Sequence, residues 1–376
     1  MSHTEEVDLL SIDDPVSALE FLGHTASYFH ALCFTKYTAP TKPQPHSEHL
    51  AIEYRLQLYL ASNIVMDALK NQIVINETFE NLLAQAKNPQ HRVDPEFPPK
   101  EDGVSQLVSG PAHVCDRNGR LLFLHLPRVL TAVQLDIVEE ACRDLVNAPH
   151  SKMEVKTDGS WRTSPPVGSC KITHHRSISP WFPLPSADAD GKDGGIPFVR
   201  AMREAFSLIG AVLYVLNPSQ YEQGVETWQK LAATNCEGSA PKCAELMAGV
   251  LRIWASPFTV TQVISNRETP FHFDTLGNPN WYDCLLTVGR YGGGRLELKR
   301  VGRRFRYERG TMAFILSQVL EHGVAEVDGE RICLASFMRP EVLKYILEWR
   351  AHASRPETVH SIEERLGVPE AERRGI

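Results

Sequence analysis

Polar and apolar positions in the first 86 residues alternate mainly with the period of an α-helix. The segments 16–34 (VSALEFLGHTASYFHALCF) and 53–72 (EYRLQLYLASNIVMDALKNQ) carry apolar residues three and four positions apart, which gives a helix one apolar face. Polar stretches rich in proline lie at 38–46 and 87–103. Because proline interrupts a helix, both stretches predict connections, and the second predicts a domain boundary.

The second third of the chain mixes the two periods. The run 119–127 (GRLLFLHLP) predicts a strand, and 131–147 (TAVQLDIVEEACRDLVN) predicts an amphipathic helix that opens at Thr131. A further helix or helix pair is predicted over 197–232, broken at Asn217-Pro218.

Residues 258–338 form a series of short β-patterned runs, such as FTVTQVISN and RICLASFM. Glycine turns separate several of these runs, which is the pattern of a β-sandwich or small barrel. The turn glycines are Gly289, Gly292–Gly294, Gly302, Gly310 and Gly329. A helix over 340–350 and a polar tail are predicted to follow.

Composition narrows the class of protein. The 376 residues are 43% hydrophobic and 23% charged, as in an ordinary globular protein. The longest nearly apolar run, 206–216, is far shorter than the roughly 20 residues that span a bilayer. Acids in the first 14 residues stand where a secretory signal carries basic residues, and the eight cysteines form no CxxC pair. An intracellular protein with reduced thiols and no membrane segment is expected.

Charge is distributed unevenly along the chain. The net charge of −7 argues against a generally basic coat for nucleic acid, yet residues 290–309 hold eight Lys and Arg against two Glu. This basic run predicts either a face that follows DNA phosphates or a solvated strand pair whose charges oppose aggregation. Only about half of its side chains can share one surface, because successive strand residues face opposite ways.

Three side chains in the β region predict a metal site. His272 and Asp274 stand two apart in PFHFDTLGN, so on a strand they face the same side. His322 lies near the end of the region. Each histidine alone is more often a core or surface residue. Two histidines and a carboxylate from distant strands, however, are the facial triad of non-haem Fe(II) oxygenases, which leaves coordination positions open.

An arginine follows at the distance of one hairpin. Arg331 stands nine residues after His322, across the turn EVDGER. A cosubstrate that chelates iron at one end needs a fixed cation at the other, and the guanidinium fork binds carboxylate through two hydrogen bonds. Arg267, five residues before His272, is a candidate for the iron-proximal end of the same cosubstrate. The alternative for Arg331 is a hairpin arginine that faces water.

These residues resemble the HxD…H…R pattern of the 2-oxoglutarate- and Fe(II)-dependent dioxygenases, with YGGGRLEL at the family's Gly-Gly turn and strand. Within that superfamily the chain is most similar to the TET/JBP-type DNA-modifying oxygenases, in particular the compact fungal forms. The resemblance implies an α+β fold with a double-stranded β-helix (jelly-roll or cupin-like) core, supporting helices and a helical N-terminal region. It also implies Fe(II), 2-oxoglutarate and O2 as cofactors.

The domain division expected on this basis has four parts. Residues 1–86 are the helical N-terminal region and 87–110 a proline-rich linker. The dioxygenase domain covers 111–340, with its core at 258–338, and 341–376 form a C-terminal helix and tail.

The resemblance also implies roles for individual residues. Phe337, Arg339 and Asn278 are expected at the substrate base, and Cys333 beside 2-oxoglutarate. Cys333 departs from the family's Arg-x-Ser, because Arg331-Ile332-Cys333 lacks the serine hydroxyl. The residues expected to contact DNA are Arg303, Arg304, Arg306 and Lys299.

The expected activity is oxidation of a methylated base flipped out of duplex DNA. The most favoured substrate is 5-methylcytosine, with hydroxymethyl-, formyl- and carboxylcytosine as products, and N6-methyladenine demethylation is left open. Nuclear localisation is expected from this function. One alternative is an oxygenase of the same fold that hydroxylates a protein side chain or small metabolite. Another is an inactive β-helix protein that binds a partner. The sequence does not predict an oligomeric state.

Overall fold

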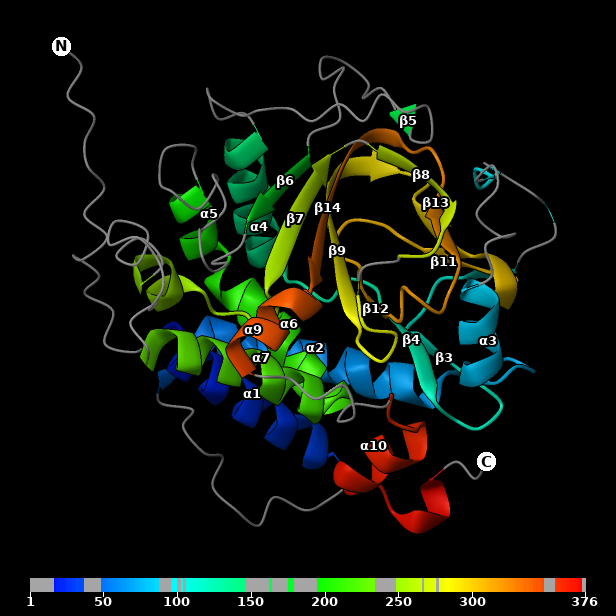
Figure 1. Ribbon diagram of the computed structural model, residues 1–376, viewed down its shortest axis with the longest axis horizontal. Helices are drawn as coiled ribbons and strands as arrows, with labels where there is room; N and C mark the ends of the chain where they lie inside the picture. Colours follow the sequence, from blue (N-terminus) through cyan, green and yellow to red (C-terminus); the bar gives the residue numbers. More distant parts are fainter. Residues whose placement is uncertain are drawn as a thin grey trace.

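The structure is a computed structural model. It describes residues 17–36, 49–87, 96–99, 103, 106–146, 162–163, 175–178, 195–233, 248–265, 267–274, 277–347 and 356–373. Two β-sheets face each other beside a layer of helices (Figure 1). The α+β fold with a double-stranded β-helix core is confirmed.

The larger sheet has eight strands in the order β1-β3-β4-β12-β9-β14-β7-β6. In this order they are Gln72–Val74, Ala112–Cys115, Leu121–Leu126, Met312–Ile315, Asp283–Gly292, Asp328–Phe337, Val260–Ser265 and His175–Ile178. The smaller sheet has six strands in the order β2-β11-β10-β13-β8-β5. These are Gln106–Val108, Arg303–Arg306, Arg295–Leu298, His322–Val324, Arg267–His272 and Arg162–Thr163.

Alternation along the strands of the larger sheet separates its two faces. On β14, Ile332 and Leu334 belong to the hydrophobic core, whereas Arg331, Cys333 and Ala335 line a cavity between the sheets. The strands β9 and β7 follow the same rule, with alternate side chains in the core and in the cavity. This period of two places polar groups inside the barrel while the other face remains apolar.

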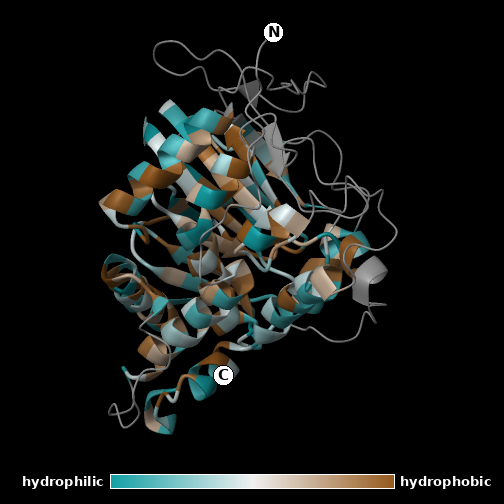
Figure 2. Cartoon of the chain, turned by 90° about the vertical axis from the view of Figure 1, so that its left-hand side faces the viewer, coloured by the Kyte–Doolittle hydropathy of each residue, from teal (hydrophilic) through white to brown (hydrophobic). Residues whose placement is uncertain are grey.

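Helices flank the two sheets. They are α1 (Ala18–Phe34), α2 (Ile52–Lys70), α3 (Phe79–Ala86), α4 (Ala132–Val146), α5 (Gly195–Ala201), α6 (Arg203–Leu216), α7 (Pro218–Ala233), α9 (Pro340–Leu347) and α10 (Val359–Arg365). Of these, α2 and α4 pack against the larger sheet. Short 3-10 helices lie at Lys299–Val301 and Glu370–Glu372. Hydrophilic and hydrophobic residues alternate along these helices (Figure 2), as expected for elements that bury one face. None of the described helices is long and apolar enough to cross a membrane.

Most of the predicted elements are confirmed. Helix α1 begins after Ser17, which forms a capping box with Glu20. The break predicted at Asn217-Pro218 separates α6 from α7, and the Asn217 side chain accepts a hydrogen bond from the Gln220 N–H (3.1 Å). The C-terminal helix α9 covers 340–347 of the predicted 340–350, and the last three residues lie outside the described part of the chain.

Several short elements were not predicted, and β1, β2 and α10 are three of them. Strand β1 lies in the region predicted to be mainly helical, and β2 lies in the predicted linker, where it pairs in parallel with β11. Helix α10 lies in the predicted polar tail and buries Ile362 and Leu366 in the core. Each is too short to show a clear period, and each depends on a partner distant in sequence. The predicted domain boundaries stay a prediction, although both sheets take strands from before residue 111.

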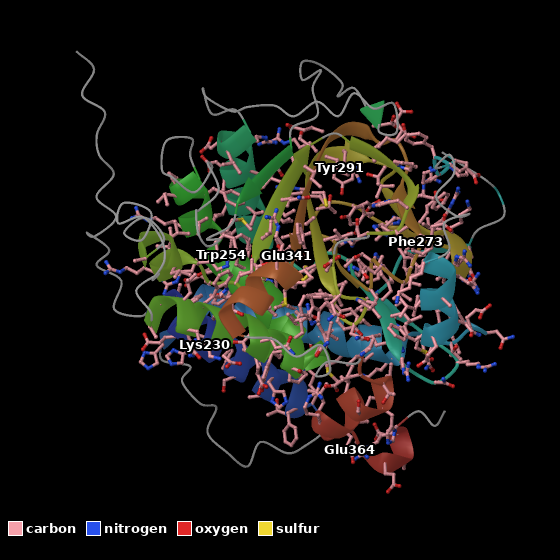
Figure 3. All side chains as sticks on the ribbon, in the orientation of Figure 1. Lys230, Trp254, Phe273, Tyr291, Glu341 and Glu364 are labelled. Carbon is pink, nitrogen blue, oxygen red and sulfur yellow. The ribbon has the colours of Figure 1, made fainter. Side chains whose placement is uncertain are left out.

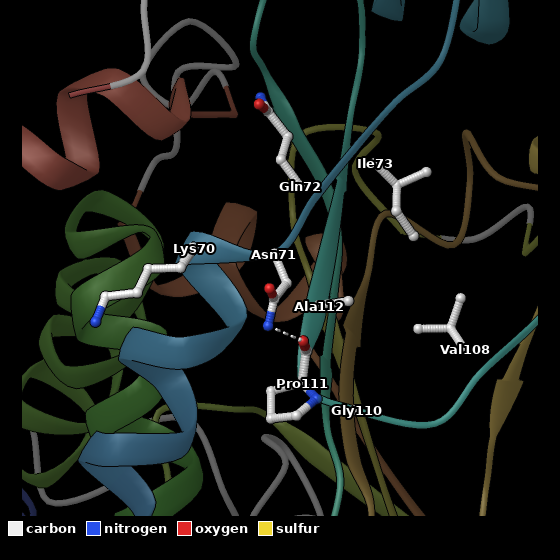
Figure 4. Close-up of a pocket in the computed structure, with 8 residues that line it drawn as sticks. All are labelled: Lys70, Asn71, Gln72, Ile73, Val108, Gly110, Pro111 and Ala112. Carbon is white, nitrogen blue, oxygen red and sulfur yellow. Dashed lines mark hydrogen bonds between the residues drawn. The ribbon is translucent and has the colours of Figure 1, made fainter. Parts of the chain in front are cut away.

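The end of α2 is fastened to β3 at the surface. The Asn71 side-chain amide donates to the Pro111 carbonyl (3.0 Å), beside a shallow hollow lined by Lys70, Ile73 and Val108 (Figure 4). This bond connects the helical layer to the larger sheet.

Candidate metal centre and cofactor cavity

Strand pairing brings the three predicted metal ligands together. His272 ends β8 and lies opposite His322, the first residue of β13, in the antiparallel register of the smaller sheet. The two ring centroids are 4.2 Å apart. Asp274 follows two residues after His272, and its backbone N–H donates to the Ser317 carbonyl (3.1 Å). One candidate ligand atom from each of the three lies within 4.8 Å of the others.

The hydrogen bonds of the imidazoles prepare both rings to bind a metal. Nδ1 of His272 lies 2.9 Å from the Pro270 carbonyl and 3.0 Å from the His322 carbonyl, and Nδ1 of His322 lies 3.0 Å from the Leu320 carbonyl. A carbonyl only accepts, so each Nδ1 carries the proton and each Nε2 keeps its lone pair. The carbonyls thereby fix the tautomer and the orientation of each ring, as second-shell groups do around metals.

The Nε2 atoms face the carboxylate of Asp274. The distances are 3.5 Å from His272 and 3.8 Å from His322 to the two carboxylate oxygens. Burial raises the pKa of Asp274, but the adjacent imidazoles of His272 and His322 outweigh it and hold that pKa well below its usual range. Burial, followed by the proximity of His272, lowers the pKa of His322 to about 4. An ionised carboxylate and a neutral imidazole are the protonation states that bind a divalent cation.

A second carboxyl group lies nearby. Asp283, the first residue of β9, accepts a hydrogen bond from the Ser317 hydroxyl and lines the same cavity. Burial and the charge of Asp274 raise the pKa of Asp283 to about 8. Asp283 is not one of the three residues whose ligand atoms converge, so the structure supports the predicted set of two histidines and one aspartate.

This donor set fits Fe(II). Two neutral imidazoles and one carboxylate form the facial triad of non-haem iron oxygenases, and they occupy only one side of an octahedral ion. Half of the Asp274 side chain (49%) is open to the cavity. Space for exogenous ligands therefore lies directly beside the proposed metal position.

The cavity between the sheets has a volume of about 680 Å³, within the range of small-molecule and cofactor sites. Its walls come from both sheets and from the segment after β14. The lining residues used below are Gln262, His272, Asp274, Asp283, Leu296, Tyr307, His322, Arg331, Cys333, Phe337, Arg339 and Glu341.

Arg331 lies inside this cavity and not in water. It is on β14, is only 4% exposed, and its guanidinium lies over the ring of Tyr307, 5.9 Å from the centroid. A buried cation in the same cavity as the metal ligands fits the predicted partner of a cosubstrate carboxylate. Cys333 also lines the cavity, two residues further along β14. Arg267 begins β8, but its side chain lies outside the described part of the structure.

The three predicted substrate residues do not share one location. Phe337 and Arg339 line the cavity together with Glu341, which lies at the start of α9 (Figure 3). Asn278 is not among the lining residues. Its side chain accepts from the Asn280 N–H (2.9 Å) and its carbonyl from the Trp281 N–H (3.0 Å). Asn278 therefore shapes a turn, which departs from the predicted contact with the substrate.

The basic run divides into buried and surface side chains. Arg304 is 4% exposed, pairs with Glu297 at 3.2 Å and donates to the Pro99 carbonyl. This corrects the prediction that Arg304 contacts DNA, because its position opposite Glu297 on β10 turns it to a covered face.

The other predicted DNA contacts have protein partners nearby. Lys299 pairs with Glu96 (3.0 Å) and lies over the ring of Phe271. Arg306 pairs with Glu308 (3.5 Å) with both side chains 40% exposed. Arg303 is half-buried and donates to the neighbouring Gly302 carbonyl. The positive surplus seen in the sequence is thus partly neutralised within the fold.

Sequence reasoning missed several polar residues of the cavity, among them Tyr307, Asp283 and Gln262. Tyr307 and Asp283 lie at the ends of strands, and Gln262 lies on β7. The positions of Asp283 and Gln262 fit the period of two, since Asp283 precedes Leu285 and Gln262 precedes Ile264 on cavity faces. That signal becomes useful only after one residue of each strand is known to face the cavity.

Part of the chain matches a known protein family. Residues 187–340 match the Tet_JBP family, described as the oxygenase domain of the 2OGFeDO superfamily. The matched segment includes the three candidate ligands and Arg331. Residues 187–340 therefore carry the oxygenase domain of a 2-oxoglutarate- and Fe(II)-dependent dioxygenase that uses O2. This segment is similar to the TET/JBP-type oxygenases. A search of the curated proteins found no match.

The solved structures to which the chain shows a likeness include NgTET1 in complex with 5mC DNA, with 17% identity over 77% of this chain and 92% of that one (TM-score 0.41). A dioxygenase for auxin oxidation from rice has 12% identity over 72% of this chain and 82% of that one (TM-score 0.30). JOX2, in complex with 2OG, Fe and JA, has 12% identity over 78% of this chain and 97% of that one (TM-score 0.32).

Proposed function

We propose that this dioxygenase oxidises a methylated base in DNA, with 5-methylcytosine as the main substrate. The products are 5-hydroxymethyl-, 5-formyl- and 5-carboxylcytosine in successive rounds. N6-methyladenine is a second substrate to test, since its hydroxymethyl product loses formaldehyde. The match to the Tet_JBP family favours a base in DNA over other substrates of the superfamily.

The observation that carries the proposal is the arrangement of one cavity. His272, Asp274 and His322 offer a facial donor set, and Arg331 lies buried in the same cavity. Bound Fe(II) and 2-oxoglutarate supply oxidation of a C–H bond by O2, with succinate and CO2 as coproducts. His272, Asp274 and His322 would hold Fe(II), Arg331 would pair with the distal carboxylate of 2-oxoglutarate, and the cavity walls would limit access of bulk water to the reacting groups.

A base also has suitable partners in the cavity. Phe337 offers an aromatic face, and Arg339, Glu341 and Gln262 offer hydrogen-bonding groups. A stacked base cannot enter an enclosed cavity, so the nucleotide is flipped out of the duplex. We propose Arg303 and Arg306 as phosphate contacts because both remain partly exposed. Nuclear localisation is proposed with this substrate.

A second candidate is hydroxylation of a protein side chain or small metabolite by the same site. Two ion pairs within the protein favour this second candidate. Arg304 pairs with Glu297 and Lys299 pairs with Glu96, so the charges of these two basic side chains are already neutralised. Such an oxygenase needs no phosphate-binding face, and its affinity for DNA should be weak at all salt concentrations.

The test loads the full chain with Fe(II) and 2-oxoglutarate without oxygen, then admits oxygen with duplexes that carry 5-methylcytosine or N6-methyladenine. Nucleosides are measured by mass spectrometry and succinate is quantified in the same sample. Oxidised base in proportion to succinate is the expected result. Succinate without any oxidised base would reject DNA as substrate and favour the second candidate. The matched control is a His272→Ala variant.

A further inference from the structure

Tyr307 lies at the junction of two residues assigned to 2-oxoglutarate. Its hydroxyl is 3.3 Å from the sulfur of Cys333, and its ring lies under the guanidinium of Arg331. All three side chains line the cavity. The phenolic side chain of Tyr307 therefore lies beside both Arg331 and Cys333 in the cavity.

Cys333 makes a donor to the same ligand as Arg331 necessary. The superfamily pattern that this chain resembles has a serine two residues after the arginine, whereas this chain has cysteine. A thiol is a weak hydrogen-bond donor compared with a hydroxyl. An enclosed carboxylate needs strong donors on both oxygens, because a lost hydrogen bond to a charged group is costly.

We propose that the Tyr307 hydroxyl replaces the missing serine hydroxyl and donates a hydrogen bond to the carboxylate of 2-oxoglutarate that pairs with Arg331. This inference rests on the proposed cofactor site. It assigns a cofactor-binding role to a residue outside the HxD…H…R pattern.

Two hydrogen bonds fix the backbone of Tyr307. The Tyr291 hydroxyl donates to the Tyr307 carbonyl (2.7 Å), and the Tyr307 N–H donates to the Gly294 carbonyl (2.8 Å). Tyr291 lies inside the barrel, under the arch of the two sheets (Figure 3). With Tyr307 only 1% exposed, its hydroxyl is positioned before the cofactor binds, which reduces the ordering cost of binding.

The protonation state also suits a donor. Burial raises the pKa of Tyr307 well above its usual value, and the neighbouring Cys333 acts in the same direction. The phenol therefore keeps its proton throughout the physiological pH range.

The test is calorimetric titration of 2-oxoglutarate into the full chain loaded with Mn(II), which requires no turnover. Tyr307→Phe keeps the ring and removes only the hydroxyl. It should weaken 2-oxoglutarate binding at least about ten-fold, the loss expected for one hydrogen bond to a charged group, with unchanged Mn(II) affinity. Tyr221→Phe is the matched control, because it removes another buried hydroxyl on α7 that does not line the cavity.

Cys333→Ser supplies a second, independent arm. Because Tyr307 already provides the hydroxyl, Cys333→Ser alone should change the affinity for 2-oxoglutarate less than about three-fold. Added to Tyr307→Phe, the same substitution should restore most of the affinity for 2-oxoglutarate that Tyr307→Phe loses. The measurement on Cys333→Ser alone does not require the Tyr307→Phe variant to fold.

Three outcomes would overturn the inference. They are unchanged 2-oxoglutarate affinity in Tyr307→Phe, an equal loss of Mn(II) affinity in that variant, and ten-fold tighter binding in Cys333→Ser alone. If the parent protein fails to bind 2-oxoglutarate at all, the cofactor site itself is rejected, and this inference with it. A further result separates the two claims. If 2-oxoglutarate affinity falls in Arg331→Lys but not in Tyr307→Phe, the cofactor site stands and only the role of Tyr307 is rejected.

Discussion

His272 and His322 lie directly opposite each other on the paired strands β8 and β13, with ring centroids 4.2 Å apart. Backbone carbonyls hold both Nδ1 atoms, so both Nε2 atoms are presented to the same point. The separation of the two proposed ligands is thus set by hydrogen-bonded strands, which position functional groups more precisely than loops do.

Removal of one histidine should abolish the metal site without unfolding the chain. With Mn(II) at about 100 times its dissociation constant, the parent protein should gain about 2.7 kcal/mol in free energy of unfolding. His322→Ala should show no such gain in thermal or denaturant unfolding. The control is His360→Ala on α10, which lies outside the proposed ligand set. A full Mn(II) response in His322→Ala would reject this ligand.

The guanidinium fork of Arg331 should matter beyond its charge. Arg331→Lys keeps a cation but loses the planar pair of donors that matches a carboxylate. We expect the 2-oxoglutarate concentration for half-maximal succinate formation to rise about ten-fold or more. Arg303→Lys, on the surface of β11, serves as the control. An equal response of the two variants would assign Arg331 a structural role.

The buried pair of Arg304 and Glu297 should contribute to folding and not to DNA binding. Arg304→Met leaves Glu297 buried without this partner, which typically costs about 3–5 kcal/mol in free energy of unfolding. Arg306→Met, which breaks the exposed pair with Glu308, should cost less than about 1 kcal/mol. Denaturant unfolding measures both. Similar losses in the two variants would contradict the difference in burial.

Charge reversal on the exposed part of the basic run tests the proposed DNA contacts. Arg303→Glu combined with Arg306→Glu should weaken binding to duplex DNA, and the loss should be larger at low salt because screening is weaker there. Fluorescence anisotropy at two salt concentrations measures the effect. Equal affinity of parent and variant at low salt would remove these two residues from the DNA-binding surface.

Gly294 should be sensitive to the smallest substitution. A Cβ there would lie 2.2 Å from the Tyr307 carbonyl oxygen and 2.6 Å from a ring carbon of Tyr291. Gly294→Ala should therefore displace Tyr307, lower the free energy of unfolding and weaken 2-oxoglutarate binding. Gly292→Ala is the matched control, because a Cβ there meets no atom within 4 Å. Equal thermal stability of both variants would contradict the prediction.

Strong local patterns made much of the fold predictable. Helices α1 and α4 follow the helical period over more than a dozen residues and begin beside recognisable capping residues. Strands β1 and β2 have three residues each and pair with partners distant in sequence. Strands β1 and β2 form because each pairs with the edge of a sheet, and the local sequence pattern does not show that pairing.

Some residues of the candidate site were predictable from the sequence and others were not. His272 and Asp274 are close in sequence, so their convergence follows from strand geometry. The role of Tyr307 depends on contacts with Cys333 and Arg331, more than 20 residues away, and required the structure. Arg304 was misjudged because charge in a sequence does not show whether a partner such as Glu297 lies across the next strand.

The order of the larger sheet has a practical consequence for shortened versions of the protein. Strand β12 lies between β9 and β4, and β4 connects through β3 to β1. A fragment limited to residues 187–340 would lack β1, β3 and β4. One side of β12 would then have no hydrogen-bonding neighbour. Unpaired strand edges recruit other chains, so this fragment should aggregate. A soluble recombinant product should include residues from α1 through α10.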